Sequence, residues 1–199
     1  MKDSFVIVGV FIVGLLSSYY GILYELLLND NFSTYILYLL MFIVGISIGA
    51  DKESLSILRK ANWKIVLIPL SVIIGSLGSV AIYALITQSI SVKEAMAVGA
   101  GFGYYSLSSI MISELHSDSL GTIALISNIV RELITLLFAP LLMIIFGKLA
   151  PVVSGGATAM DSTLPIIIKT SGKEYGILAI FSGIVLTVLV PFIISVIFA

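Results

Sequence analysis

The chain contains five long apolar runs, and these constrain its fold more than any other feature of the sequence. They cover residues 5–28, 33–50, 65–86, 120–147 and 176–199. A helix needs about 20 apolar residues to cross the hydrocarbon core of a bilayer, so each run predicts a membrane helix. The first run has no small-residue cleavage pattern after its opening stretch, which favours a retained helix over a removed signal peptide.

The composition excludes several classes of protein. Of the 199 residues, 59% are hydrophobic and 11% are charged, whereas roughly a quarter are charged in soluble domains. The membrane helices leave no room for a soluble catalytic or nucleic-acid-binding domain, so we expect one integral membrane domain over residues 1–199 and no nucleic-acid partner. The chain has no cysteine, which excludes disulfides and thiolate metal sites.

Two further stretches, residues 95–115 and 151–170, are apolar but interrupted by Gly, Ser, Thr and Pro. The linker 51–64 carries Lys52, Arg59, Lys60 and Lys64, so the positive-inside rule places it in the cytoplasm together with the N-terminus. The other basic residues are compatible both with two full crossings and with two re-entrant segments, but fit poorly with one of each, so we expect the two stretches to behave alike. The predicted fold is an all-α polytopic membrane protein with about five full transmembrane helices, two broken or re-entrant segments and an external C-terminus.

Small residues recur at helical spacing in three of the runs and predict seams where membrane helices pack closely. They are Gly14, Ser18 and Gly21 in the first run, Gly45 and Gly49 in the second, and Ser71, Gly75 and Gly78 in the third.

Two charged residues, Arg131 and Glu132, interrupt the run 120–147 near the predicted middle of the bilayer. Burying such charges there costs at least ~2.5–3.5 kcal/mol each. With Asn128 and Thr135 they follow i, i+3, i+4 and i+7 spacing, so they form one polar stripe that must face protein or a water-filled cavity. Arg131 and Glu132 are expected to pair with groups on other helices, either for function or only to fix helix packing.

The stretch 154–165 contains Gly155, Gly156 and Pro165, which disfavour a continuous helix. Asp161, Ser162 and Thr163 are good helix caps. We therefore predict an unwound segment followed by a half-helix that begins near Thr163. Its free N–H groups would lie at membrane depth beside the Asp161 carboxylate. A polar turn at the membrane surface is the alternative.

The other broken stretch is rich in glycine from residue 99 to residue 103, with Tyr104 and Ser106 directly after. It lacks the flanking strand and the Lys-Ser/Thr pair of a nucleotide-binding loop, so the glycines predict an unwound helix. Ser106, Ser109 and Ser113 are then expected to lie on one face of the helix that follows. Glu114, His116 and Asp118 predict an interfacial loop rather than a metal site, because one histidine is not a usual ligand set.

Two interrupted helices that flank a helix with charges at mid-membrane are typical of secondary transporters, whose discontinuous helices meet at a central binding site. Membrane enzymes fit less well. The chain has no HExxH motif, Asp161 has no second mid-membrane aspartate, and the single histidine lies in a predicted loop. We expect a transporter, not an enzyme, and no metal or cofactor.

Four motifs stand out, and the last is the most specific, because its order of Gly, Ala, Thr, Met and Asp is not one that generic membrane composition yields. They are Gly99-Ala-Gly-Phe-Gly-Tyr-Tyr-Ser-Leu-Ser, Leu120-Gly-Thr-Ile-Ala, Arg131-Glu132-Leu133 and Gly155-Gly-Ala-Thr-Ala-Met-Asp-Ser-Thr-Leu-Pro165. With them the chain resembles, from about residue 38 to its C-terminus, the bacterial lysine exporter family LysO. The resemblance implies export of L-lysine and toxic lysine analogues across the inner membrane of a bacterial or archaeal cell. It also implies transport roles for the matching acidic residues, Glu132 and Asp161.

The chain departs from this family in two respects. Fused members are about half as long again, with extra N-terminal helices, and split members have a separate small membrane protein instead. The resemblance therefore implies a companion membrane protein or a homo-oligomer. Tyr104 stands where fused members often have Trp, which keeps an aromatic side chain there.

Lysine carries two ammonium groups and a carboxylate, so its site needs acidic groups and an anion-binding group. We assign Asp161 and Glu132 to the cationic end, and Arg131 or the half-helix N-terminus near Thr163 to the carboxylate. The predicted substrate site comprises Asp161, Glu132, Arg131, Asn128, Thr163, Ser162, Tyr104 and Ser106. Exporting a cation against the membrane potential costs ~2.3 kcal/mol per 100 mV, so we expect proton antiport. The alternatives are a carrier of another cationic solute, such as arginine, ornithine or Na⁺, or a non-transporting membrane subunit.

Overall fold

The computed structural model describes residues 63–199, together with scattered single positions between residues 13 and 46. The chain divides into two compact units, Met1–Ile43 and Val44–Ala199, and the second contains all of the helices from residue 63 onward. The predicted helices over residues 5–28 and 33–50, their packing seams and the basic linker up to residue 62 lie outside the described residues, apart from those single positions, whereas Lys64 at the end of that linker belongs to a described helix.

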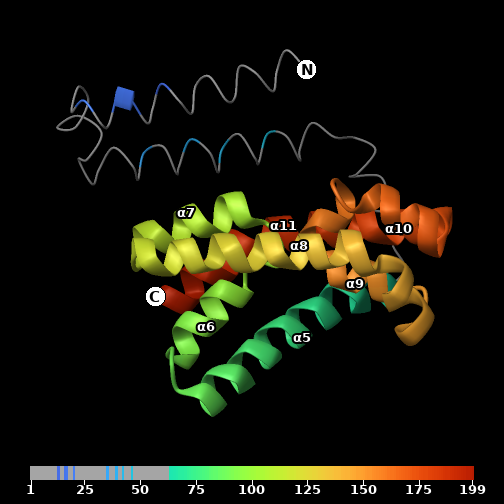
Figure 1. The fold of residues 1–199 in the computed structure, drawn as a ribbon, viewed down its shortest axis with the longest axis horizontal. Coiled ribbons are helices and arrows are strands. Elements are labelled where there is room, and N and C mark those ends of the chain that lie inside the picture. Colours follow the sequence, from blue (N-terminus) through green and yellow to red (C-terminus); the bar gives the residue numbers. More distant parts are fainter. Residues whose placement is uncertain are drawn as a thin grey trace. The chain divides into compact units, whose positions relative to one another are not determined.

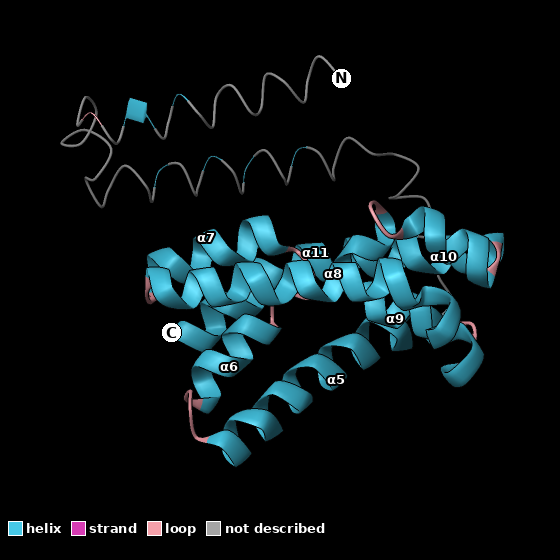
Figure 2. Ribbon diagram, viewed as in Figure 1, coloured by secondary structure: helices cyan, strands magenta, loops and turns pink. Residues whose placement is uncertain are grey.

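From residue 63 onward the described chain is entirely helical, with seven α-helices and one 3₁₀-helix (Figures 1 and 2). In chain order they are α5 (Trp63–Thr87), α6 (Val92–Gly99), α7 (Tyr105–Leu115), α8 (Asp118–Phe146), α9 (Ala150–Gly155), η1 (Gly156–Met160), α10 (Leu164–Ser171) and α11 (Lys173–Phe198).

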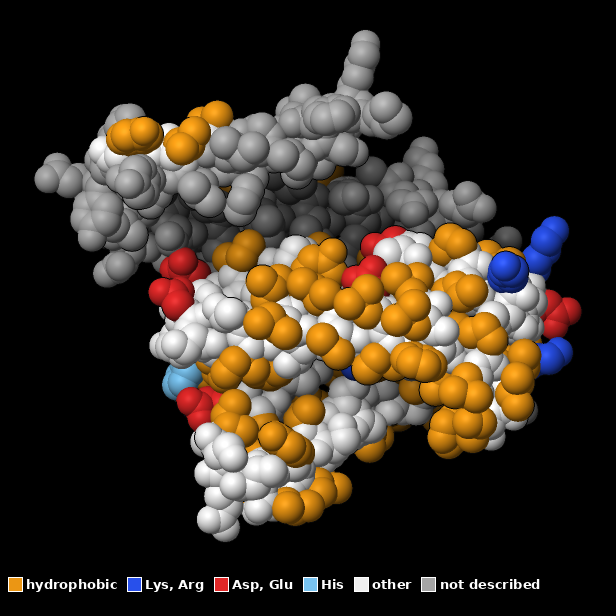
Figure 3. Space-filling model, in the orientation of Figure 1, with side chains coloured by type: hydrophobic (Ala, Val, Ile, Leu, Met, Phe, Trp, Pro, Cys, Tyr) orange, Lys and Arg blue, Asp and Glu red, His pale blue; other side chains and the backbone are white. Residues whose placement is uncertain are grey.

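Three of these helices are long and apolar enough to cross a membrane: α5 from residue 65, α8 and α11. They coincide with the predicted runs 65–86, 120–147 and 176–199, which confirms an all-α membrane protein. Their outer faces are apolar, as lipid requires, and large hydrophobic side chains cover much of the surface in Figure 3. On α8, for example, Leu137, Ile144 and Phe146 are each more than two-thirds exposed.

The first broken stretch folds back on itself as a hairpin, called hairpin 1 (residues 92–115). α6 and α7 are its arms, and the chain unwinds between them over residues 100–104. At its base the Glu94 Oε1 atom lies 2.9 Å from Nε2 of His116, so the start of α6 and the end of α7 lie at the same end of the bundle. α7 then packs along α8 (Figure 1).

The second broken stretch, hairpin 2 (residues 150–171), folds back in the same way. α9 leads in, η1 forms the tip and α10 leads out. The Lys148 ammonium, just before α9, lies 5.9 Å from the ring centroid of Tyr175, at the start of α11. Hairpin 1 ends where α8 begins and hairpin 2 starts where α8 ends, so the two enter the bundle from opposite ends (Figure 1). The expectation that the two stretches behave alike is consistent with this geometry.

Candidate functional site

The tips of the two hairpins meet between the long helices. The amide N–H of Ala157 donates to the carbonyl oxygen of Phe102 at 2.8 Å. Phe102 is fully buried and has a φ of +47°, a left-handed conformation that is uncommon for a residue other than glycine. Gly156 has a φ of +62°, and a Cβ atom there would collide with this same carbonyl oxygen. The predicted interruptions of both stretches are therefore present and form one junction.

Asn128 on α8 binds the unwound part of hairpin 1. Its Oδ1 atom accepts a hydrogen bond from the Gly103 N–H at 2.7 Å, and its Nδ2 atom donates to the carbonyl oxygens of Ala124 at 2.8 Å and Val98 at 3.5 Å. Where a helix is interrupted at a place that water does not reach, its backbone N–H and C=O groups lose their partners, and each needs a hydrogen bond from another part of the protein. The buried Asn128 side chain makes these hydrogen bonds at the end of α6.

Arg131 has the corresponding contacts with hairpin 2. Its Nε atom donates to the Ser154 carbonyl at 2.9 Å and Nη2 donates to the Val153 carbonyl at 3.1 Å, so the guanidinium caps the last turn of α9. A cation suits this position because the C-terminal end of a helix carries partial negative charge. Nη1 donates to the Ser76 hydroxyl on α5 at 2.9 Å. The prediction that Arg131 pairs with groups on other helices is confirmed, and those groups are carbonyls and a hydroxyl.

Thr135 completes the stripe. Its hydroxyl is buried, donates to the Arg131 carbonyl at 3.0 Å and lies 2.7 Å from the Ser154 hydroxyl. Glu132 is half-buried on the same helix. Within the described part of the chain it has no hydrogen bond or ion pair, so its pairing with another helix stays a prediction.

The Asp161 carboxylate lies at the exposed side of the hairpin tips. Its Oδ1 atom accepts from the Ser162 N–H at 2.5 Å, and both residues are exposed. The half-buried Tyr104 hydroxyl lies beside the Ser106 side chain and within electrostatic reach of Asp161. Four residues of the predicted substrate site, Asp161, Ser162, Tyr104 and Ser106, thus belong to one neighbourhood formed by both hairpins.

Thr163 occupies the cap position of α10, which begins at Leu164, close to the predicted start. The predicted side-chain cap is wrong for this residue. Its backbone is helical, with φ −91° and ψ −7°, and its buried hydroxyl lies 3.4 Å from that of Thr158. α7, which begins after Tyr104, also lacks a side-chain cap. Two half-helices therefore start at the hairpin tips with N–H groups that no side chain caps.

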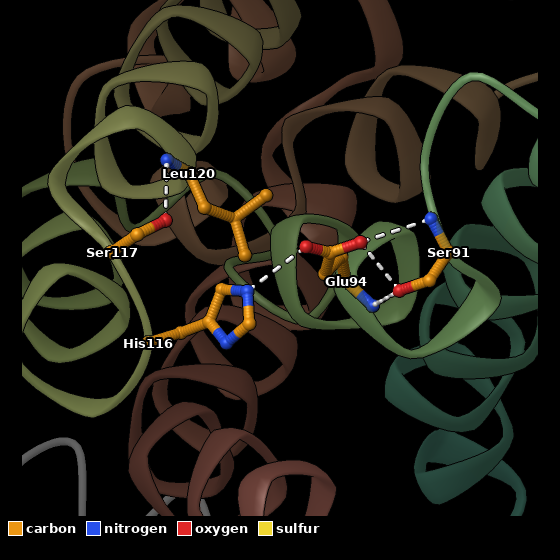
Figure 4. Close-up of polar contacts among 5 residues, drawn as sticks. All are labelled: Ser91, Glu94, His116, Ser117 and Leu120. Atoms are coloured by element: carbon orange, nitrogen blue, oxygen red, sulfur yellow. Dashed lines mark hydrogen bonds and ion pairs between the residues drawn. The ribbon is translucent and has the colours of Figure 1, made fainter.

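His116 belongs to a group of polar contacts that joins the two arms of hairpin 1 at its base (Figure 4). Ser91 and Glu94 form a capping box at the start of α6, and hydrogen bonds from Ser91 and His116 lower the pKa of Glu94 to about 2. The His116 ring also stacks on Phe198 at 5.2 Å between centroids. No group of three or more metal-binding side chains occurs among the described residues. The Ser91-x-x-Glu94 pattern could have indicated the cap, but no sequence pattern indicated its histidine partner.

A groove of about 360 Å³ runs between α5, α8 and α9. Its lining includes Ser71, Gly75, Ser76, Arg131 and Ser154, and we call it the Arg131 groove. The recess between α5 and α8 is visible in Figure 3. The packing seam predicted for the third run is not found within the described residues, since a Cβ at Gly75 or Gly78 would meet no atom within 4 Å. Ser76 was missed because an isolated serine carries no signal in an apolar sequence, and Ser154 was included in the predicted broken stretch 154–165 but was given no role.

Comparison with known proteins agrees with the family suggested by the motifs. The family described as lysine exporter LysO matches residues 8–198, so the similarity begins well before residue 38. The lysine exporter LysO of Escherichia coli K12 is 32% identical over 196 residues, which cover 97% of this chain and 63% of that protein. A relative from Haemophilus influenzae is 35% identical over 160 residues, 79% of each chain.

The chain thus spans about 63% of the length of its Escherichia coli relative. No solved structure matches it. The match nevertheless extends over nearly the whole chain and includes the hairpin tips, the charged stripe of α8 and Asp161. The chain belongs to the lysine exporter LysO family.

Proposed function

We propose that this chain exports L-lysine and toxic lysine analogues across the cell's inner membrane by proton antiport. The observation that carries the proposal is the contact between Phe102 and Ala157, where two broken helices from opposite ends of the bundle meet beside Asp161. Discontinuous helices that meet between apolar spans are the usual place for a solute site in secondary transporters. The names of the relatives supply the class of solute.

The hairpins support a re-entrant arrangement. Each has both ends at one end of the bundle, as the Glu94–His116 and Lys148–Tyr175 contacts indicate. With the two predicted N-terminal spans, this gives a multi-pass protein with five crossings, two re-entrant segments and a cytoplasmic N-terminus.

The proposed site binds the cationic side chain and amino group of lysine through Asp161 and Glu132. Tyr104, Ser106 and Ser162 supply hydroxyl groups near the Asp161 carboxylate. Asn128 and Thr163 contribute by holding the two hairpins in place, since their side chains contact hairpin groups. The carboxylate of lysine is held by Arg131 or by the uncapped N-terminus of α10.

Proton coupling follows from the charge of the solute. One carboxylate can bind lysine and a proton alternately. It releases the lysine cation when a proton binds, and it can bind lysine again after the proton has left. Inward movement of one proton for each lysine exported would be electroneutral and would offset the ~2.3 kcal/mol per 100 mV that uncoupled export requires.

Reconstitution of the purified full chain into proteoliposomes tests the proposal. We expect a proton gradient to drive uphill lysine movement, with weaker movement of arginine and ornithine and none of Na⁺. Lysine movement that does not depend on the proton gradient would contradict antiport. Movement of Na⁺ but not lysine would favour the ion-exchanger alternative.

A cellular assay tests whether a partner is required. Cells that lack their own exporter should gain resistance to a toxic lysine analogue when they express the chain, alone as a homo-oligomer or together with a small companion membrane protein. Resistance with neither arrangement would favour a non-transporting subunit.

A further inference from the structure

Arg131 presents a positive charge to the Arg131 groove, and the part of the chain that the structure describes places no negative charge opposite it. Among residues 65–199 no carboxylate lies within ion-pair distance of its guanidinium, and the groove wall around it is made of serines, glycine and valine. An unpaired charge at membrane depth is costly and usually marks a solute or ion site.

The hydrogen bonds show which donors remain free in the groove. A guanidinium has five N–H groups, and the protein accepts from three of them, through Ser154, Ser76 and Val153. One N–H on each of Nη1 and Nη2 is therefore without an acceptor in the described part of the chain.

Ser76 supplies a third free donor. Its hydroxyl oxygen accepts from Arg131, and its own proton has no acceptor among the described residues. The other hydroxyls of the groove already donate their protons elsewhere. Ser71 donates to the Ile68 carbonyl, and Ser154 must donate to Thr135, because the single Thr135 proton goes to the Arg131 carbonyl. Among the described residues, the free donors of the groove are thus two N–H groups and one O–H group beside a fixed positive charge.

We infer that the Arg131 groove binds the α-carboxylate of the transported amino acid. A guanidinium with a neighbouring hydroxyl matches the two oxygens of a carboxylate, and the same charge repels the ammonium groups of the solute. The groove volume falls in the range of small-molecule sites. The inference rests on the proposed function and deepens it, because it assigns the carboxylate to Arg131 rather than to α10 and makes that carboxylate a requirement for recognition.

Competition binding to the purified full chain tests this inference. Unlabelled L-lysine, L-lysinamide and 1,5-diaminopentane compete against radiolabelled L-lysine; lysinamide has a neutral amide in place of the carboxylate, and the diamine lacks the group altogether. We expect both analogues to bind about tenfold more weakly than lysine, or worse, because the donors of the groove are left unpaired.

Ser76→Ala removes the free hydroxyl donor together with the oxygen that accepts from Nη1 of Arg131, so a melting curve of the variant verifies that it stays folded. We expect the variant to bind lysine several-fold more weakly and to bind the diamine with unchanged affinity. The difference in affinity between lysine and the diamine should therefore become smaller. Thr87→Ala is the matched control, since this exposed hydroxyl on the same helix donates to its own Tyr83 carbonyl, away from the groove. It should change neither affinity.

Equal competition by lysine and the diamine would overturn the inference while leaving lysine binding, and hence the proposed function, intact. Equal weakening of lysine binding by Ser76→Ala and Thr87→Ala would overturn it too. Failure of the wild-type chain to bind lysine at all would contradict the proposed function itself.

Discussion

Arg131 and Ser154 are joined by a hydrogen bond of 2.9 Å from Nε to the backbone carbonyl, which ties α8 to the broken end of α9. A charged residue in the middle of an apolar span is therefore in contact with the backbone that the break leaves exposed. Asn128, one turn earlier, does the same for hairpin 1. One face of α8 thus stabilises both interruptions, and this explains how irregular backbone can persist among apolar helices.

Replacing Arg131 with leucine should destabilise the protein. The carbonyls of Val153 and Ser154 would lose their partner, at about 1–3 kcal/mol for each group that remains buried. Thermal unfolding in detergent measures the effect. Leu137→Ala, at a 71% exposed position of α8, is the control and should change stability little. Equal stability of the two variants would contradict a capping role for Arg131.

Gly156→Ala should disrupt the junction of the hairpins. The position has a φ of +62°, which an L side chain rarely adopts, and a Cβ atom would meet the Phe102 carbonyl and the Arg131 guanidinium. We expect strong loss of folded protein and of transport, read by size-exclusion chromatography and flux. Gly78→Ala on α5 has open space around its Cβ and should be tolerated, because alanine favours a helix by about 1 kcal/mol over glycine. A folded, active Gly156→Ala protein would contradict the close contact.

Asp161→Asn should abolish lysine export while the protein stays folded and inserted. Asparagine keeps an oxygen that can accept from the Ser162 N–H, so local structure is retained and only the charge is lost. Flux in proteoliposomes, compared with a melting curve of the same preparation, separates the two effects. Asp118→Asn, at the exposed start of α8, is the matched control and should transport normally. Unchanged transport by Asp161→Asn would refute its role at the cationic end.

Glu94 should make a small, pH-dependent contribution to stability. Hydrogen bonds from Ser91 and His116 lower its pKa from 4.5 to about 2, so its contribution is complete above about pH 4.5 and is lost as the pH falls toward 2. Because the carboxylate is largely solvated, the effect should stay below ~1 kcal/mol.

The measurement is the melting temperature of wild type and Glu94→Gln between pH 7 and pH 2. The difference between them should shrink as the pH falls below 4.5, whereas Glu114→Gln, at an exposed position of the same hairpin, should follow the wild type throughout. A difference that is constant with pH would show that the Glu94 carboxylate has no such role.

Local sequence features predicted the three long helices of the described part of the chain and the break before α10. Apolar runs of bilayer length predicted α5, α8 and α11, and paired glycines with Pro165 predicted the break before α10 to within one residue. These predictions succeeded because span length, backbone freedom at glycine and the start of a helix at proline depend on neighbours in the sequence. The spacing of Asn128, Arg131 and Thr135 also predicted correctly that this face of α8 contacts protein.

Only the tertiary structure decided how the broken stretches are arranged and what the charges contact. The number of basic residues on each side of the membrane was equally compatible with two full crossings or with two re-entrant segments. The contacts of Glu94 with His116 and of Lys148 with Tyr175 showed that each stretch folds back. The partners of Arg131 are backbone carbonyls and a serine 55 residues earlier, and the two tips meet through backbone atoms of Phe102 and Ala157. Backbone groups are the same in every residue and leave no pattern in a sequence, so contacts between distant backbone segments become visible only once the chain has folded.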